Sequence, residues 1–222
     1  SRFQARSLPW EIPMPQYRLR ILALIVLALL IGCSDDSVEP LSSCCDGFPF
    51  ADSADVLMEN FARAYGELDA VEYRDMIDSR YRFYDVESAN HNAVTEIRII
   101  EAMFSGNPPT NPAPGSTAAG IRSVEVVRCS LLEPWVEVSE SHPDFGGVAG
   151  ARRGFFDTHM KFLHDSGNIT VNTHQFFYAV PVTVVADGVS KTEWKMLGQE
   201  DVELKAGNED MSWSGLKFLF RP

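Results

Sequence analysis

The clearest hydrophobic pattern in the chain lies just after residue 50. Apolar side chains recur there on one helical stripe, at Leu57, Met58, Phe61, Ala64, Tyr65 and Leu68. This spacing predicts an amphipathic helix, which Asp52 or Ser53 is placed to cap. The next four residues, Asp69-Ala-Val-Glu72, have the form of a capping box with Asp in the Ser/Thr role. They predict a short second helix that carries Tyr73, Met76 and Ile77.

The pattern then changes twice before residue 120. Arg80–Asp85 alternates weakly and is aromatic, which predicts a strand. A third helix is expected from Asn92, its cap, to about Phe104. Its inward face is predicted to hold Ile97, Ile100, Met103 and Phe104. Residues 105–120 are rich in Pro and Gly and predict a long loop.

From Ile121 onward the pattern is typical of strands. The predicted strands are Ser123–Arg128, Trp135–Ser139, Arg153–Leu163, Ile169–Val185 and Lys191–Leu204. Residues 164–168 and the Asp187-Gly188 pair predict hairpin turns, and Pro181 indicates an edge, a bulge or a strand end. Helices followed by a meander of strands indicate an α+β fold.

An unbroken apolar run lies upstream of this region, at Ile21–Ile31. It is about half of the roughly 20 residues that a membrane-spanning helix needs, and Arg18 and Arg20 precede it. These features predict a signal peptide. Its end, Leu30-Ile-Gly-Cys33, resembles a bacterial lipobox, and the resemblance implies that Cys33 is acylated and becomes the mature N-terminus.

The chain therefore divides into four predicted parts. Residues 1–13 look like upstream or non-native sequence, and residues 14–32 are the lipoprotein signal peptide. Residues 33–50 are polar and acidic and are expected to be a tether. Residues 51–222 form one domain with a C-terminal extension. We expect the mature protein to be lipid-anchored and extracytoplasmic, on the outer membrane or the periplasmic face of a bacterial membrane.

Charge excludes some partners of the mature protein. The chain has a net charge of −12, and removing a basic signal peptide leaves the rest more acidic still. Such a surface repels nucleic acid and anionic lipid headgroups, so attachment to the bilayer must come from the acylated Cys33. No cofactor is expected. The remaining partner classes are a small apolar ligand, a protein partner or a second copy in a homodimer.

Three further cysteines bear on the oxidising compartment that a lipoprotein would occupy. Cys44 and Cys45 are adjacent, and Cys129 is far along the chain. An odd number predicts one disulfide and one free thiol, and we expect Cys44 or Cys45 to pair with Cys129. A metal site at Cys44-Cys45 is disfavoured because the usual two-residue spacer between ligands is missing.

Several motifs, taken in order, resemble the nuclear transport factor 2-like superfamily, which includes ketosteroid-isomerase-like and polyketide-cyclase-like proteins. They are the stripe 57–68, the segment 69–77, Tyr81-Arg-Phe-Tyr84, the segment 192–201 with its Trp, Lys and acid, and the tail 213–220. The resemblance implies a cone-shaped α+β fold in which helices pack in a curved antiparallel sheet. It does not carry over a catalytic motif, so the fold alone does not specify function.

The candidate site residues are few. Tyr65 and Tyr73 could donate hydrogen bonds inside the cone, and Asp85 could act as a general base if buried. His159 and His174 share a sheet face if residue 164 pairs with residue 169, and point to opposite faces if residue 163 does. For each of these residues an ordinary structural role is favoured over a catalytic one.

Two classes of function remain at this stage. One is a non-enzymatic binding or interaction module, which is favoured because no acid–base pair is visible in the sequence. The other is an acid–base enzyme, such as an isomerase, cyclase or dehydratase, acting on a small apolar substrate. A cone filled with Phe and Met would favour the module, and a buried polar residue with a perturbed pKa would favour the enzyme. In the apolar tail, Phe218 and Phe220 alternate with Leu219 as in a strand. This tail is expected to dock on the domain and to bury Trp213 and at least one of the two Phe side chains.

Overall fold

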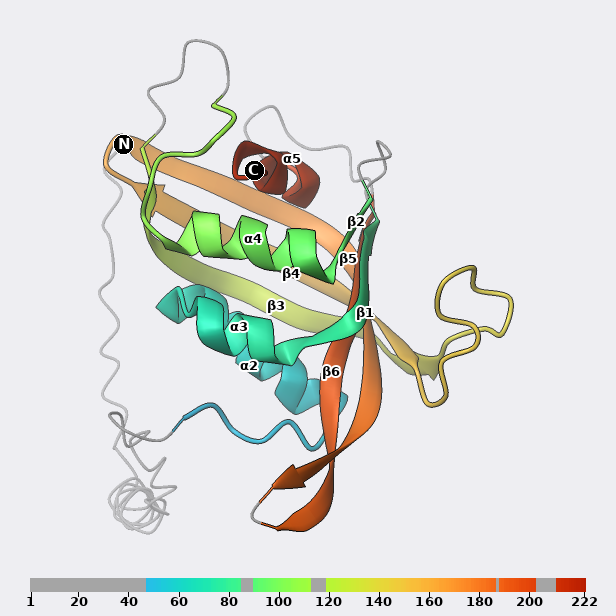
Figure 1. Ribbon diagram of the computed structural model, residues 1–222. Coiled ribbons are helices and arrows are strands. Elements are labelled where there is room, and N and C mark those ends of the chain that lie inside the picture. Colours follow the sequence, from blue (N-terminus) through green and yellow to red (C-terminus); the bar gives the residue numbers. More distant parts are fainter. Residues whose placement is uncertain (1–46, 85–89, 113–118, 187, 203–210) are drawn as a thin grey trace, which may run out of the picture. The chain divides into compact units, whose positions relative to one another are not determined.

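The computed structural model describes residues 47–84, 90–112, 119–186, 188–202 and 211–222 (Figure 1). The predicted leader, signal peptide and lipidation site Cys33 lie outside these ranges, as do Cys44, Cys45 and Asp85. Gly47–Pro222 forms one compact unit. Within the described ranges, no helix has both the length and the apolar character needed to cross a bilayer.

The unit begins slightly earlier than the sequence indicated. Residues 47–50 were expected in the tether, but they pack on the domain instead. The Asn60 side-chain amide donates a hydrogen bond to the Pro49 carbonyl oxygen at 2.7 Å, and the Arg63 guanidinium lies 4.5 Å from the Phe48 ring centroid. These two contacts hold the short segment against the helix that follows it.

Three helices follow, and each begins at a side-chain cap. Helix α2 (Ala54–Glu67) is capped by Ser53, α3 (Ala70–Met76) by Asp69, and α4 (Ala93–Phe104) by Asn92. In each cap a side-chain oxygen accepts a hydrogen bond from a backbone N–H of the first turn, which satisfies a donor that the helix itself cannot. The stripe of α2 and the positions of the three helices confirm the sequence prediction, except that Ile77, expected on the second helix, is the first residue of the strand that follows it.

Six strands form one curved sheet in the order β2-β1-β6-β5-β4-β3. Their bounds are Ile77–Tyr84 for β1, His91–Asn92 for β2, Ile121–Glu137 for β3, Arg152–His164 for β4, Gly167–Ala186 for β5 and Val189–Val202 for β6. All neighbouring pairs are antiparallel except β1 and β6, which are parallel. The expected antiparallel sheet thus holds everywhere except at this pair.

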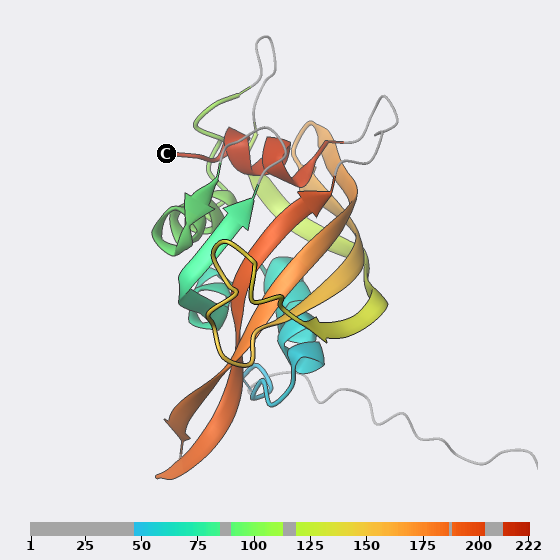
Figure 2. The same ribbon diagram turned by 90° about the vertical axis from the view of Figure 1, so that its right-hand side faces the viewer.

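Figures 1 and 2 show α2, α3 and α4 on the concave side of the sheet. The last helix, α5 (Trp213–Leu219), lies across the upper end of the sheet in both views. This arrangement confirms the α+β fold in which helices pack inside a curved sheet. It is the cone that the nuclear transport factor 2-like resemblance implied.

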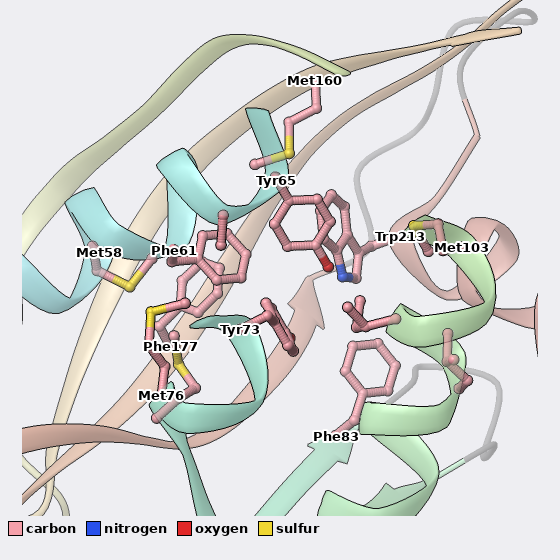
Figure 3. Packing of buried hydrophobic residues seen from close by; sticks show 14 of the residues in the cluster. Met58, Phe61, Tyr65, Tyr73, Met76, Phe83, Met103, Met160, Phe177 and Trp213 are labelled. Carbon is pink, nitrogen blue, oxygen red and sulfur yellow. The ribbon is translucent and has the colours of Figure 1, made fainter. Parts of the chain in front are cut away.

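Aromatic and Met side chains fill the concave side (Figure 3). Phe61 and Tyr65 of α2 lie 5.1 Å and 5.2 Å, between ring centroids, from Phe177 of β5 and Trp213 of α5, respectively. Rings at these separations pack at favourable tilted or edge-on angles and add to the free energy of burial. The core therefore joins the first helix to the C-terminal one.

Two elements differ from their predicted form. Ser123–Arg128 and Trp135–Ser139 were expected as separate strands, but β3 runs through both. It does so because its register with β4 shifts at several points, including between Glu133 and Val136, where Pro134 interrupts the ladder. The residues of α4 that face inward also differ: Glu96 and Ile99 are buried, whereas Ile97 is only half-buried.

The tail is a helix and not the strand that its alternating Phe218 and Phe220 indicated. Ser212 caps it, and its side-chain oxygen accepts a hydrogen bond from the Gly215 N–H at 2.9 Å. Trp213, Leu216 and Phe220 lie on one helical face and are buried, whereas the Phe218 side chain is 58% exposed. The expected docking of the tail, with Trp213 and one Phe buried, is confirmed.

Candidate functional site

A carboxylate lies at the centre of the cone, on the buried face of α4. Ala93, Glu96, Ile100 and Met103 follow one another at helical spacing on that face, so Glu96 occupies a position that the pattern reserves for an apolar residue. Its side chain is fully buried. A charge in such a place is costly unless other groups pair with it.

Three side chains from three different elements satisfy the Glu96 carboxylate. The Tyr73 hydroxyl of α3 donates to Oε1 at 2.7 Å. The Lys217 ammonium of α5 lies 2.8 Å from Oε1 and 3.0 Å from Oε2. His91 Nε2 of β2 lies 2.5 Å from Oε2, and because an ionised carboxylate only accepts, we place the proton on Nε2.

These contacts keep the carboxylate ionised. Burial by itself would raise the pKa of Glu96, but the Lys217 charge and the contacts with His91 outweigh it and bring the pKa down to about 2. Burial lowers the pKa of Lys217, and the Glu96 carboxylate opposes that shift. At neutral pH the centre of the cone therefore holds a paired carboxylate and ammonium.

The Lys217 ammonium has further contacts that a desolvated cation needs. It donates to the Gln199 side-chain oxygen at 3.0 Å and lies 3.8 Å from the centroid of the Phe83 ring. The same Gln199 oxygen lies 3.3 Å from the Tyr81 hydroxyl. A carboxylate, an amide oxygen and an aromatic face together replace the water that Lys217 loses on burial.

A second buried carboxylate connects α5 to the sheet. Asp201 of β6 accepts from the Gln175 side-chain amide at 2.7 Å. Its other oxygen accepts from the Ser214 N–H at 2.8 Å and the Ser214 hydroxyl at 2.5 Å. Burial raises the pKa of Asp201, while the bonds from Ser214 and Gln175 and the charge of Lys217 oppose the rise. Both buried carboxylates thus bind the C-terminal helix.

Several buried polar groups have no hydrogen-bond partner within the described part of the chain. Among them are two donors whose rings pack together, the Tyr65 hydroxyl and the Trp213 indole N–H. Figure 3 shows both polar atoms on the inner side of α2 and α5, and the two ring centroids are 5.2 Å apart. Burial raises the pKa of Tyr65 well above its usual value, the Glu96 charge adds to the rise, and Tyr73 opposes it. The Tyr65 hydroxyl is therefore a neutral donor.

The candidates proposed from sequence do not meet in one place. Tyr65 and Tyr73 are both in the core, and of the two only Tyr73 contacts Glu96. His159 is half-buried on β4, where it is paired in register with Asn172. Asp85 is among the residues that are not described.

The observed register of β4 and β5 differs from both of the registers considered for His159 and His174. His164 pairs with Gly167, so His159 lies opposite Asn172 and His174 lies opposite Asp157. The two histidines consequently share a face but are displaced by two residues along the strands. Among the described residues, no group of three His, Cys, Asp or Glu side chains is arranged to hold a metal.

Tyr73 was a candidate, but Glu96, His91 and Lys217 were missed because the charged partners are distant in sequence. Glu96 and Lys217 are separated by 121 positions. One local signal was available for each: Glu96 interrupts the stripe that begins at Ala93, and Lys217 interrupts the apolar tail 213–220. A charged residue on an apolar helical face indicates either a buried pair or a functional site.

Cys129, on β3, forms no disulfide with another described residue. Burial raises its pKa to about 12, although the Thr158 hydroxyl opposes the shift. The disulfide expected between Cys129 and Cys44 or Cys45 stays a prediction, because those two residues lie outside the described ranges.

A scan of protein-family models finds none that matches the chain, and a search of curated proteins also finds no match. Solved structures of similar fold do exist. An NTF2-like protein of unknown function in nutrient uptake from Rhodospirillum rubrum is 11% identical, with a TM-score of 0.43, over 69% of this chain and 99% of that chain. A putative aromatic ring hydroxylase from Novosphingobium aromaticivorans is 11% identical, with a TM-score of 0.42, over 68% and 87%. An NTF2-like superfamily protein from Salmonella enterica is 8% identical, with a TM-score of 0.41, over 70% and 92%. At such low identity these similarities concern the fold alone.

Proposed function

We propose that this protein is a lipid-anchored, extracytoplasmic lipoprotein whose domain acts as a binding or interaction module and not as an enzyme. The anchor is the acylated Cys33 expected from the lipobox-like sequence Leu30-Ile-Gly-Cys33. The tether 33–46 then joins the lipid to the domain, which begins at Gly47.

The observation that best supports a binding module over an enzyme is that the Glu96 carboxylate has a full set of hydrogen-bond and ion-pair partners. Tyr73, His91 and Lys217 together make four contacts to its two oxygens, which is the number a carboxylate accepts. A general base works best when its pKa lies near the operating pH and one oxygen is open to the substrate. Glu96 meets neither condition, because its pKa is about 2 and both of its oxygens already have partners.

A buried polar residue with a perturbed pKa can indicate an enzyme, but the pKa of Glu96 is perturbed in the direction that disfavours acid–base catalysis. Catalytic carboxylates that act as acids or bases at neutral pH have a raised pKa. The Glu96 pKa is lowered by an internal ion pair, which is the pattern of a structural cluster. The Phe and Met side chains around it favour the module as well.

One observation favours the alternative, an acid–base enzyme acting on a small apolar substrate. The Tyr65 hydroxyl and the Trp213 N–H are two buried donors without partners in the described ranges, and they lie close to each other. Such a pair would suit a single acceptor oxygen, such as the carbonyl of an apolar molecule.

Mass spectrometry of protein extracted from membranes tests the anchor. We expect a mature chain that begins at acylated Cys33, and we expect Cys33→Ser to leave the precursor unprocessed. A mature N-terminus elsewhere, without an acyl group, would contradict the proposal.

A carboxyl titration followed by NMR tests whether the cone is a module or an enzyme. In protein labelled with carbon-13 at the Glu carboxyl, the signal that disappears in Glu96→Gln belongs to Glu96. We expect it to stay ionised down to about pH 2. A midpoint near neutral pH would instead describe a poised acid or base and would favour the enzyme.

A further inference from the structure

The long hairpin of β5 and β6 projects beyond the rest of the sheet (Figures 1 and 2). The register of β4 with β5 ends at Ala179, and that of β1 with β6 begins at Met196. Residues 180–186 and 189–195 therefore pair with each other and have neither β4 nor β1 beside them. We call residues 181–186 and 189–194 the distal hairpin.

The tip of the distal hairpin exposes apolar side chains. Val185 is 75% exposed and Val189 is 57% exposed. Phe50 lies near the same end, with its ring centroid 5.6 Å from the Lys191 ammonium, and is also partly exposed. Valines, an aromatic ring and a lysine close to that ring are typical of a segment at a membrane–water interface.

Charge distinguishes the distal hairpin from the rest of the domain. The chain as a whole has a net charge of −12, but in the distal hairpin Lys191 balances Glu193. The distal hairpin can therefore approach an anionic lipid surface without the repulsion that the rest of the chain would meet. By contrast, the exposed Leu132 and Val136 of β3 lie among Glu133 and Glu137.

The start of the domain lies at the base of the distal hairpin. The Trp194 N–H donates to the Ala51 carbonyl oxygen at 2.7 Å, so the entering chain is fixed beside β6. The tip lies about 17 Å further along the strands, at roughly 3.3 Å per residue. A random-coil chain as long as residues 33–46 would span roughly 20 Å end to end, and a tether of that reach would allow the tip to meet the bilayer.

We propose that the tip of the distal hairpin rests in the lipid surface and orients the anchored domain, with Val185 and Val189 among the headgroups. This inference rests on the proposed lipid anchor at Cys33. Two partly exposed valines bind too weakly to hold a protein on a membrane by themselves. The acyl chains supply the attachment, and the distal hairpin decides which end of the domain faces the bilayer.

A fluorescent probe on the acylated full-length protein tests the orientation. Cys44, Cys45 and the half-buried Cys129 are replaced by Ser, so that none of them takes the label. An environment-sensitive dye is attached to Val185→Cys, and the protein is inserted in vesicles of phosphatidylcholine and phosphatidylglycerol. The matched control is Ser166→Cys, which is also exposed in a hairpin turn but at the other end of β5.

We expect the dye at 185 to shift its emission to the blue and to be quenched by spin-labelled lipids, while the dye at 166 behaves as in water. Adding Val189→Asp should return the dye at 185 to the behaviour of the control, because a carboxylate is unfavourable in the interface. A dye at 185 that stays in water on acylated protein would overturn this inference and leave the anchor intact. Mass spectrometry that finds Cys33 without an acyl group would overturn both.

A second copy of the chain is the alternative occupant, and the same probe separates it from lipid. Shielding of the dye at 185 without vesicles, increasing with protein concentration, would assign the distal hairpin to self-association. That result would also overturn the proposal.

Discussion

Lys217→Met should destabilise the domain strongly, because it removes the cation that pairs with Glu96. The change keeps a long apolar side chain against Phe83 but leaves the carboxylate with only Tyr73 and His91. Removing one partner of a buried ion pair costs about 3–5 kcal/mol. For a domain of this size each kcal/mol lowers the thermal midpoint by about 2–4 °C, so we expect a fall of roughly 6–20 °C.

Thermal and urea unfolding followed by circular dichroism measure this cost. Lys161→Met is the matched control, because Lys161 pairs with Glu125 at 3.5 Å on the surface of the sheet, where both side chains are more than a third exposed. The control should lose less than about 1 kcal/mol. The double variant Glu96→Gln, Lys217→Met has no unpaired charge in the core and should recover a large part of the loss.

The reasoning would be wrong if Lys217→Met lost no more unfolding free energy than Lys161→Met. It would also be wrong if the double variant lost the sum of the two single losses. Either result would mean that Lys217 and Glu96 do not depend on each other, and that α5 is held by its apolar residues alone.

Three further predictions concern the same core. The pKa of Glu96 falls from 4.5 to about 2 on folding, so its contribution to stability is present above pH 4.5 and is lost as the pH falls towards 2. The difference in unfolding free energy between wild type and Glu96→Gln, measured with urea, should therefore shrink over that range. A chain that ends at Val202 lacks α5 and the burial of Trp213, and its thermal midpoint should fall by more than roughly 10 °C; an unchanged midpoint would mean that α5 is not part of the stable core. Cys129 is half-buried, but its pKa is raised to about 12, so it should react with a thiol reagent at neutral pH much more slowly in the native protein than after unfolding; equal rates in the two states would contradict the raised pKa.

The sequence was informative wherever the determining interactions are local. Ser53, Asp69 and Asn92 cap helices within three residues of themselves, so the first half of the fold could be predicted from neighbouring positions. The meander was also predictable, because the turns after β4 and β5 carry glycines with positive φ, Gly167 and Gly188.

The tail was mispredicted because two periods fit so short a segment. Phe218 and Phe220 alternate as in a strand, while Trp213, Leu216 and Phe220 follow a helical spacing. Contacts made by distant groups decide between the two. Asp201 accepts from both the N–H and the hydroxyl of Ser214, a geometry that suits the first turn of a helix.

The buried cluster could not be predicted because its members look like surface residues until the chain is folded. Glu96 and Lys217 are ordinary residues of helix surfaces, and each is buried only because the other supplies the opposite charge. A local reading therefore assigned the inward face of α4 to Ile97 in place of Glu96. That error shifts the inward face by one residue about the helix axis. Only Lys217, 121 positions away, shows that Glu96 is the buried residue.

The two buried carboxylates also explain why α5 has a single orientation. Apolar contacts of Trp213, Leu216 and Phe220 favour docking of the helix but do not select its rotation sharply, because hydrophobic burial is not directional. Hydrogen bonds are directional, and Asp201 and Glu96 bind α5 at Ser214 and Lys217, about one turn apart along the helix. A helix rotated out of this position would leave Asp201 with only Gln175 and Glu96 with only Tyr73 and His91. The charges in the core thus penalise every alternative docking of the tail, and this account requires no catalytic role for them.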